Sequence, residues 1–203
     1  MKKIIHLFFD ICLLLASITY LIFKHNKVYG ESWDQEKLPK TIVLGSGPSL
    51  KVDIEKVIEE SINSEVYVLN YFALTKYFNE IKPEYYALTD RIFWSQHAND
   101  DIKKDNEKLF LCLDEVDWKM TLICSESGFH WVSERLVKNK NIKVSKVYSV
   151  NVEFKNEKIN LFALNQNIIT PHFINGLVMV IWHAIYRKRL DIEIYGADFS
   201  MFK

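Results

Sequence analysis

The sequence is short of the residues that mark linkers, disulfide frameworks and zinc sites. Its 203 residues include only 6 Gly, 4 Pro and 3 Cys. The cysteines (Cys12, Cys112 and Cys124) are odd in number and none belongs to a Cys-x-x-Cys pair. This argues against a disulfide framework or a zinc site and suits a reducing compartment. With no low-complexity tract and no evident repeat, little room is left for a disordered linker.

The sequence also lacks an excess of charge of either sign. It carries 26 Lys and Arg against 26 Asp and Glu, and it contains no long basic run. The chain therefore offers no net field to attract a polyanion, and we expect no nucleic-acid partner. About half of the residues, 49%, are hydrophobic, which is enough for one domain with a substantial core and one extra element.

One long apolar run is present, and it lies at the N-terminus. Residues 4–23 are mostly Ile, Leu, Phe and Ala, and at helical rise their length matches the hydrocarbon core of a bilayer. Asp10 lies inside the run, with His6 one helical turn earlier on the same face. No convincing small-x-small cleavage site follows, so we predict an uncleaved membrane-anchor helix over residues 1–27. An interfacial helix, or a helix buried in a homo-oligomer, is the alternative.

Beyond this run, short apolar segments alternate with helical ones. Residues 28–39 are polar and predict a tether, and a domain is expected over residues 40–203. We expect strands at 41–44, 65–70, 85–90, 109–113, 121–124, within 142–150 and at 191–196, and helices at 52–62, 71–80 and 177–186. Such alternation predicts an α/β fold, a Rossmann-like doubly wound and mostly parallel sheet, preceded by the N-terminal hydrophobic helix.

The most informative stretch is the glycine-rich turn after the first expected strand, Gly45-Ser46-Gly47-Pro48-Ser49. At such a turn, glycines let the backbone approach a ligand, and the N–H groups of the following helix favour an anion such as phosphate. The longer dinucleotide fingerprint and the Lys-Ser/Thr of a P-loop are both absent, so a plain strand-to-helix turn is the alternative. We expect a nucleotide here, because ligands collect at the carboxyl ends of parallel strands.

Polar residues also follow the other expected strands. Asn70 follows the second strand, Thr89 and Asp90 follow the third, and Asp198 follows the last. In a parallel sheet they would all lie at the edge that holds the glycine turn. The Asn70 amide suits a base or a ribose, and the Asp90 carboxylate suits a hydroxyl or a metal held through water. Helix capping is the alternative for either residue, but for the whole set we favour a ligand site.

The other candidates for chemistry are weaker. His172 and His183 have no partner at metal-ligand spacing, so we expect no metal site and assign neither a catalytic role. Segment 125–128 (Ser-Glu-Ser-Gly) lacks the glycine-x-serine-x-glycine pattern of a nucleophile elbow, which disfavours a hydrolase. The basic cluster at 187–189 stands at a helix end, where the helix dipole accounts for it.

Four short motifs follow one another along the chain. They are Gly45-Ser46-Gly47-Pro48-Ser49-Leu50, Val68-Leu69-Asn70-Tyr71-Phe72, Asn175-Gly176 at the start of a long apolar helix, and Ile194-Tyr195-Gly196-Ala197-Asp198-Phe199. Their order resembles that of bacterial sialyltransferases of glycosyltransferase family 42. The resemblance implies a CMP-activated sugar bound without a metal, and a glycan acceptor in lipooligosaccharide or capsule synthesis. It also implies the bacterial inner membrane as the location, with the domain facing the cytoplasm.

The same resemblance implies roles for individual residues. The glycine turn, Asn70, Thr89 and Asp90 would lie at the nucleotide, and Asn175, Gly176 and Asp198 would lie at the donor sugar. The catalytic histidine and the lid of the family follow the Gly-x-Asp-Phe strand, whereas the chain stops at Lys203. We therefore expect a C-terminally incomplete domain and assign no catalytic base.

The motifs also resemble a second family, the domain of unknown function shared with archaeal 6-hydroxymethylpterin diphosphokinases. Its members carry a similar glycine turn and an acidic residue after the third strand, where this chain has Asp90. This resemblance implies a magnesium–triphosphate and pyrophosphoryl transfer, in which positioning and charge neutralisation do most of the work. A third hypothesis is a non-catalytic, membrane-anchored scaffold of a polysaccharide assembly complex.

Overall fold

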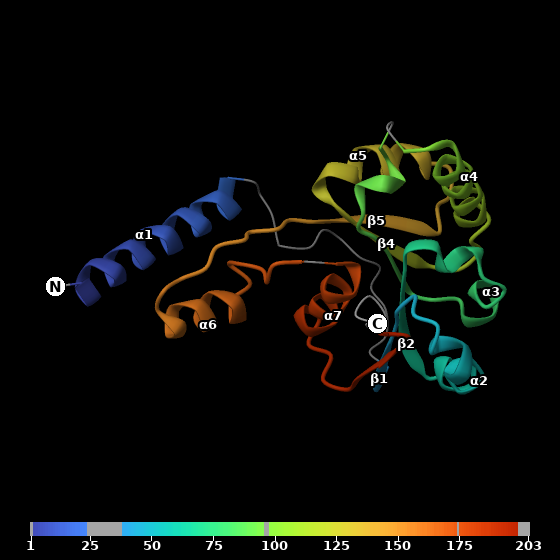
Figure 1. Ribbon diagram of the computed structural model, residues 1–203, viewed down its shortest axis with the longest axis horizontal. Coiled ribbons are helices and arrows are strands. Elements are labelled where there is room, and N and C mark those ends of the chain that lie inside the picture. The colour runs from blue at the N-terminus through green and yellow to red at the C-terminus, as the bar shows by residue number, and fades with distance from the viewer. Residues whose placement is uncertain (1, 24–37, 96–97, 174, 199–203) are drawn as a thin grey trace. The chain divides into compact units, whose positions relative to one another are not determined.

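The computed structural model describes residues 2–23, 38–95, 98–173 and 175–198 (Figure 1). The chain divides into two compact units. One unit combines residues 1–30 with 147–174, and the other combines residues 31–146 with 175–203. The second unit contains the sheet and every residue of the predicted ligand site. The first unit groups the N-terminal helix with a segment that the sequence analysis places in the sheet domain.

The larger unit is built on a six-stranded sheet with the order β5-β4-β3-β2-β1-β6. The strands are β1 (Lys40–Leu44), β2 (Ser64–Leu69), β3 (Tyr85–Leu88), β4 (Met120–Ser125), β5 (Ile142–Val147) and β6 (Ile192–Tyr195). Strand β1 pairs in parallel with β2 and β6, β2 pairs in parallel with β3, and β3 pairs in parallel with β4. The prediction of a Rossmann-like α/β fold with a parallel sheet is therefore confirmed.

The strand order places β1 between β2 and β6. The chain moves outward from β1 to β5 and then returns to add β6 on the other side of β1. The direction of progression thus reverses between β1 and β6, and in open α/β sheets ligands bind outside the carboxyl ends of the strands at such a point. Because Leu44 at the end of β1 is paired with Tyr195 at the end of β6, the turns that follow these strands start side by side.

Helices cover both faces of this sheet. On one face, α2 (Leu50–Ser61), α3 (Phe78–Ile81), α4 (Asp100–Asp114) and α5 (Glu126–Arg135) share a core with Val66 and Val68 of β2. The side chain of Tyr67, between these two valines, instead contacts His183 of α7 (Gly176–Tyr186). Since side chains alternate along a strand, α7 covers the opposite face. The apolar helix predicted at 177–186 is confirmed as this buried element.

The strand predicted at 109–113 is wrong, because these residues belong to α4. Leu109, Phe110 and Leu113 are buried on one side of this helix, and the Asn99 side chain caps its start by accepting from the N–H of Ile102 at 2.9 Å. A short apolar run does not by itself distinguish a buried strand from a buried helix. The helix predicted at 71–80 is also wrong in extent: it is a 3₁₀ turn, η1 (Asn70–Leu74), followed by α3.

The smaller unit contains α1 (Lys2–Phe23) and α6 (Glu157–Asn165). Leu14 of α1 packs against a buried cluster of Val150, Phe154, Ala163 and Ile169. The N-terminal helix predicted from the sequence is confirmed. Within the ranges that the structure describes, however, no helix meets the length and apolarity needed to cross a bilayer, so the spanning part of the prediction for residues 1–27 is not confirmed. Most of the predicted tether, 28–39, lies outside the described residues.

Candidate functional site

The site predicted after β1 is a surface made by two turns. The N–H of Gly45 donates to the carbonyl oxygen of Tyr195 at 2.7 Å, and the N–H of Gly47 donates to that of Gly196 at 2.8 Å. The hydrogen-bonded ladder between β1 and β6 thus continues past the ends of both strands. The glycine turn lies directly against the turn at Gly196, within the last of the four motifs.

Close packing explains the glycines of these turns. A Cβ on Gly45 would lie 2.3 Å from the carbonyl oxygen of Gly196, and a Cβ on Gly47 would lie 2.6 Å from the same oxygen and 2.3 Å from Oδ2 of Asp198. Gly196 itself has a φ of +64°, in the left-handed region that favours glycine. The Gly-x-Gly pattern therefore allows one backbone to approach another, which is a role that needs no ligand.

Asp198 lies at the start of α2. Its Oδ2 accepts a hydrogen bond from the N–H of Ser49 at 2.7 Å, one residue before the helix begins at Leu50. A carboxylate at a helix N-terminus is stabilised by the helix dipole and by the N–H groups there. The sequence analysis predicts a phosphate at this position, whereas in the structure the chain's own carboxylate makes the contact. Asp198 and the glycine turn thus lie side by side, as the prediction requires. In the structure they are hydrogen-bonded to each other, whereas the prediction has both contacting a ligand.

Asn70 lies at the carboxyl end of β2 in an unusual backbone conformation. Its φ is +56°, which asparagine tolerates better than most residues. The hydroxyl of Tyr86 donates to the carbonyl oxygen of Asn70 and accepts from the N–H of Ala73, which fixes this turn. The side-chain Oδ1 of Asn70 is buried and has no hydrogen-bond partner among the described residues. Buried acceptors usually have a partner, so this oxygen is the strongest single indication of a ligand contact.

Thr89 and Gly176 are also brought together. A Cβ on Gly176 would lie 2.7 Å from Oγ1 of Thr89, so the turn after β3 packs tightly against the start of α7. The side chain of Asn175 caps this helix, because its Oδ1 accepts from the N–H of Val178 at 3.0 Å. The predicted donor-sugar residues Asn175 and Gly176 therefore have a structural role at the carboxyl edge of the sheet.

For Asp90, the structure shows the capping role that was left as an alternative. Its Oδ1 accepts from the N–H of Ile92 at 3.1 Å and caps the short turn η2 (Arg91–Phe93). No group of three or more His, Cys, Asp or Glu side chains positioned to hold a metal ion occurs in the described part of the chain. Phe199, the last residue of the fourth motif, lies outside that part.

The end of β4 contributes polar residues to the same edge of the sheet that were not predicted from the sequence. Ser125 ends this strand and Ser127 lies in the first turn of α5, with their hydroxyl oxygens 2.9 Å apart. In the sequence, this segment was considered only as a nucleophile elbow. The position of Ser125 at the end of a strand could have assigned it to the site, since each of the preceding strands ends in a polar turn at the same edge.

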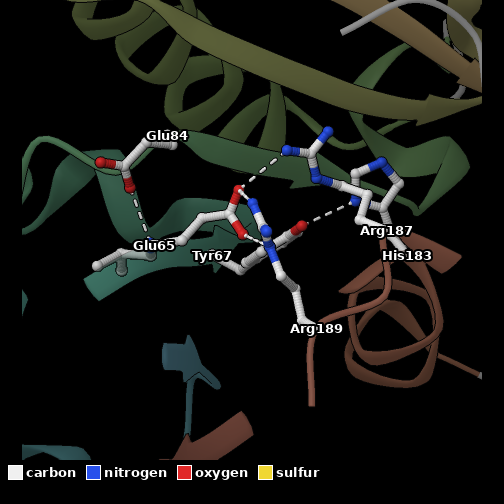
Figure 2. Close-up of polar contacts among 7 residues, drawn as sticks. Glu65, Tyr67, Glu84, His183, Arg187 and Arg189 are labelled. Atoms are coloured by element: carbon white, nitrogen blue, oxygen red, sulfur yellow. Dashed lines mark hydrogen bonds and ion pairs between the residues drawn. The ribbon is translucent and has the colours of Figure 1, made fainter. Parts of the chain in front are cut away.

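A second polar cluster lies at the opposite, amino end of the strands (Figure 2). Glu65, near the start of β2, is 1% exposed and accepts hydrogen bonds from Nε and Nη2 of Arg189 and, at 3.2 Å, from Nη2 of Arg187. The guanidinium of Arg187 also lies over the ring of Tyr85, 4.8 Å from its centroid. The basic cluster at 187–189, which was assigned to the helix dipole, thus supplies the partners of a buried carboxylate.

Two further titratable groups belong to this cluster (Figure 2). Nδ1 of His183 lies 3.1 Å from the hydroxyl oxygen of Tyr67, and burial next to Arg187 lowers the histidine pKa to about 3. Glu84 accepts from the N–H of Val66 at 2.8 Å, and burial raises its pKa to about 7. His183 is therefore neutral at physiological pH. It is a buried core residue whose ring nitrogen has the Tyr67 hydroxyl as its partner.

The comparisons with known proteins give no family for this chain. Neither the models of known protein families nor the curated proteins contain a significant match to it. The two resemblances given by the motifs therefore stay predictions, and the site is interpreted from its geometry.

Proposed function

We propose that the larger unit binds the nucleotide of an activated sugar at the turns after β1 and β6. In this proposal it is a sialyltransferase-like glycosyltransferase that uses a CMP-activated sugar in bacterial surface polysaccharide synthesis. The observation that carries the proposal is the reversal of strand order between β1 and β6, at which a glycine-rich turn meets a helix N-terminus. The buried and unpartnered Oδ1 of Asn70 supports a ligand at the same edge.

The chemistry requires Asp198 to give up one of its contacts. The departing nucleotide phosphate would be stabilised by backbone N–H groups, and the N–H of Ser49 is the natural donor because it precedes α2. In the structure this N–H donates to Asp198. Phosphate and the Asp198 carboxylate therefore compete for one donor. When phosphate binds, Asp198 loses its hydrogen bond from the N–H of Ser49. We assign no general base.

A non-catalytic scaffold is the alternative that one observation favours. Because Asp198 already satisfies the N–H of Ser49, the glycine turn is complete without a ligand. The diphosphokinase-like alternative requires Asp90 to help hold magnesium, and Oδ1 of Asp90 is engaged by the N–H of Ile92. The three hypotheses predict different ligands and different requirements for magnesium.

Calorimetric titration of the full chain in detergent with CMP, CMP-sialic acid, and ATP with and without magnesium tests the proposal. We expect magnesium-independent binding of the cytidine ligands. Gly47→Ala should abolish it, since its Cβ would lie 2.6 Å from a backbone oxygen of the facing turn. Glu59→Ala, at an exposed position of α2 beyond the glycine turn, is the control and should bind normally.

Asp198→Asn distinguishes the transferase from the scaffold. If phosphate competes for the N–H of Ser49, removing the negative charge from the α2 N-terminus should tighten CMP binding by a few-fold. This factor corresponds to the interaction energy of one charge with a helix end. Magnesium-dependent ATP binding would favour the diphosphokinase-like alternative. The proposal of nucleotide binding would be contradicted if neither wild-type protein nor Asp198→Asn bound any of the nucleotides. Cooperative thermal unfolding would have to show that both proteins are folded.

A further inference from the structure

In the helix α1, two polar residues, Asp10 and Ser17, lie inward and most of the large apolar residues lie outward. Among its described side chains, only Asp10 and Ser17 are buried, and they lie on the side where Leu14 contacts the core of the smaller unit. Large apolar side chains are exposed instead, including Phe8 at 66% and Leu15 at 58%. A helix that packs onto a protein core in water has the reverse arrangement.

The charge on Asp10 is compensated within the smaller unit. Its two carboxylate oxygens accept from the N–H groups of Lys155 at 3.1 Å and Asn156 at 2.8 Å, immediately before α6 begins. Asp10 therefore binds the N-terminus of α6, where a negative charge is stabilised. The single acidic residue of the apolar run joins two segments that are about 145 residues apart in sequence and is 2% exposed.

The hydroxyl groups of α1 are likewise satisfied within the helix. Ser17 donates to the carbonyl oxygen of Leu13 at 2.9 Å, and Thr19 donates to that of Leu15 at 2.7 Å. Such bonds to the preceding turn are favoured where no water is available, because an unsatisfied hydroxyl in an apolar medium is costly. The outward surface of α1 therefore exposes few unsatisfied polar groups.

The exposed apolar surface of α1 is too wide for one protein partner. At 100° per residue, the exposed side chains from Leu7 through Phe8 and Phe9 to Leu13 cover roughly two thirds of the helix circumference. A single partner helix or groove covers a stripe of about 100°. Leu161 and Phe162 of α6, 53% and 52% exposed, add to the apolar surface of the unit.

We propose that α1 and α6 together form a lipid-binding module that inserts into one leaflet of a membrane. The apolar arc of α1 contacts acyl chains, and Asp10 is hidden against the start of α6. This inference goes beyond the proposed nucleotide site and does not depend on it. It assigns the segment 147–173, which carries no apolar run long enough to suggest a membrane, to the same module as the N-terminal helix.

The charge of the module predicts which lipids it binds. The exposed ionisable residues around the start of α6 are two acidic and two basic ones: Glu153, Lys155, Glu157 and Lys158. With Lys2, Lys3 and Asp10 of α1 they give the described residues of the module a net charge of only +1, so the apolar surface contributes more to insertion than electrostatic attraction. We therefore expect the module to bind neutral phosphatidylcholine vesicles about as well as vesicles that contain anionic phosphatidylglycerol.

Flotation of the full chain with phosphatidylcholine vesicles tests the proposal. Wild-type protein should float, and Phe8→Glu or Leu15→Glu should reduce the bound fraction at least about tenfold, since each puts a charged side chain in place of an exposed apolar one that would contact lipid. Phe162→Glu should weaken binding as well. This result would distinguish a module formed by α1 and α6 from lipid binding by α1 alone. Val52→Glu, at an 84% exposed apolar position of α2 in the larger unit, is the matched control and should float like wild type.

A probe on Cys12 adds a structural readout. Cys12 is exposed on α1, whereas Cys124 is buried, and Cys112→Ser removes the remaining thiol. A fluorophore on Cys12 should be quenched by nitroxides on the acyl chains more than by nitroxides on the headgroups. The proposal is overturned if wild-type protein does not float, or if Phe8→Glu floats equally well. It is also overturned if the free chain forms a discrete dimer that Phe8→Glu dissociates.

Discussion

Glu84 is a partly buried residue whose ionisation affects the stability of the fold. It lies just before β3, and burial together with the nearby Glu65 carboxylate raises its pKa to about 7 from an ordinary value of 4.5. The folded state therefore holds a proton that the unfolded state releases between these two values. The N–H of Val66 donates to its carboxyl group in either form.

We predict that the contribution of Glu84 to the free energy of unfolding falls by up to about 3 kcal/mol as the pH rises from about 4.5 to 7. The contribution of Glu84 is fully present below pH 4.5 and is lost as the pH rises through its folded-state pKa. Urea denaturation across this range, compared between wild type and Glu84→Gln, measures the contribution. The glutamine variant keeps an acceptor for Val66 and should lose the contribution of Glu84, so its stability relative to wild type should increase as the pH rises.

Glu59→Gln, at an exposed position of α2, is the control and should keep the pH dependence of wild type. His183 acts in the opposite direction. Because burial lowers its pKa to about 3, its contribution is present above its ordinary value of 6.5 and is lost as the pH falls. A stability of Glu84→Gln that increases relative to wild type as the pH rises from about 4.5 to 7 supports our account, and a difference between the two proteins that does not change with pH contradicts it.

At the scale of elements, the turn before α7 decides between a capping and a ligand role for Asn175. Its Oδ1 accepts from the N–H of Val178, so Asn175→Ala should lower the free energy of unfolding by about 1 kcal/mol. Asn175→Ser keeps an oxygen that caps the helix and should retain most of the stability. Chemical denaturation of the three proteins measures the difference. Unchanged stability of the alanine variant, together with weaker CMP binding, would instead assign Asn175 to the ligand.

Several elements are predictable from the sequence because their signals are local. The β1 strand, the glycine turn and the apolar α7 each combine a clear apolar pattern with a turn or a cap. The segment 109–113 is mispredicted because five apolar residues fit either period. Its helical state is decided by the cap at Asn99 and by packing of the whole of α4. Helices α5 and α6 were missed, since their apolar faces are short and interrupted by polar residues.

At the scale of the whole molecule, contacts between distant segments set what the sequence does not reveal. The polar residues at the carboxyl ends of the strands could be assigned to one edge, because parallel strands have that geometry. The hydrogen bond from Ser49 to Asp198 could not be predicted from the sequence, since it joins residues 149 positions apart and depends on the position of β6 beside β1. In the same way, nothing local to residues 147–174 indicates that they group with α1.

The central claim is that a nucleotide binds where the turns after β1 and β6 meet. Hydrogen–deuterium exchange of the full chain, with and without saturating CMP, tests it most directly. We predict that CMP slows exchange at the backbone amides of residues 45–47, 49–50 and 196–198, while amides beside the buried cluster at Glu65 and Arg189 keep their rates. Protection by CMP that is confined to other segments, with these two turns unchanged, would contradict the account.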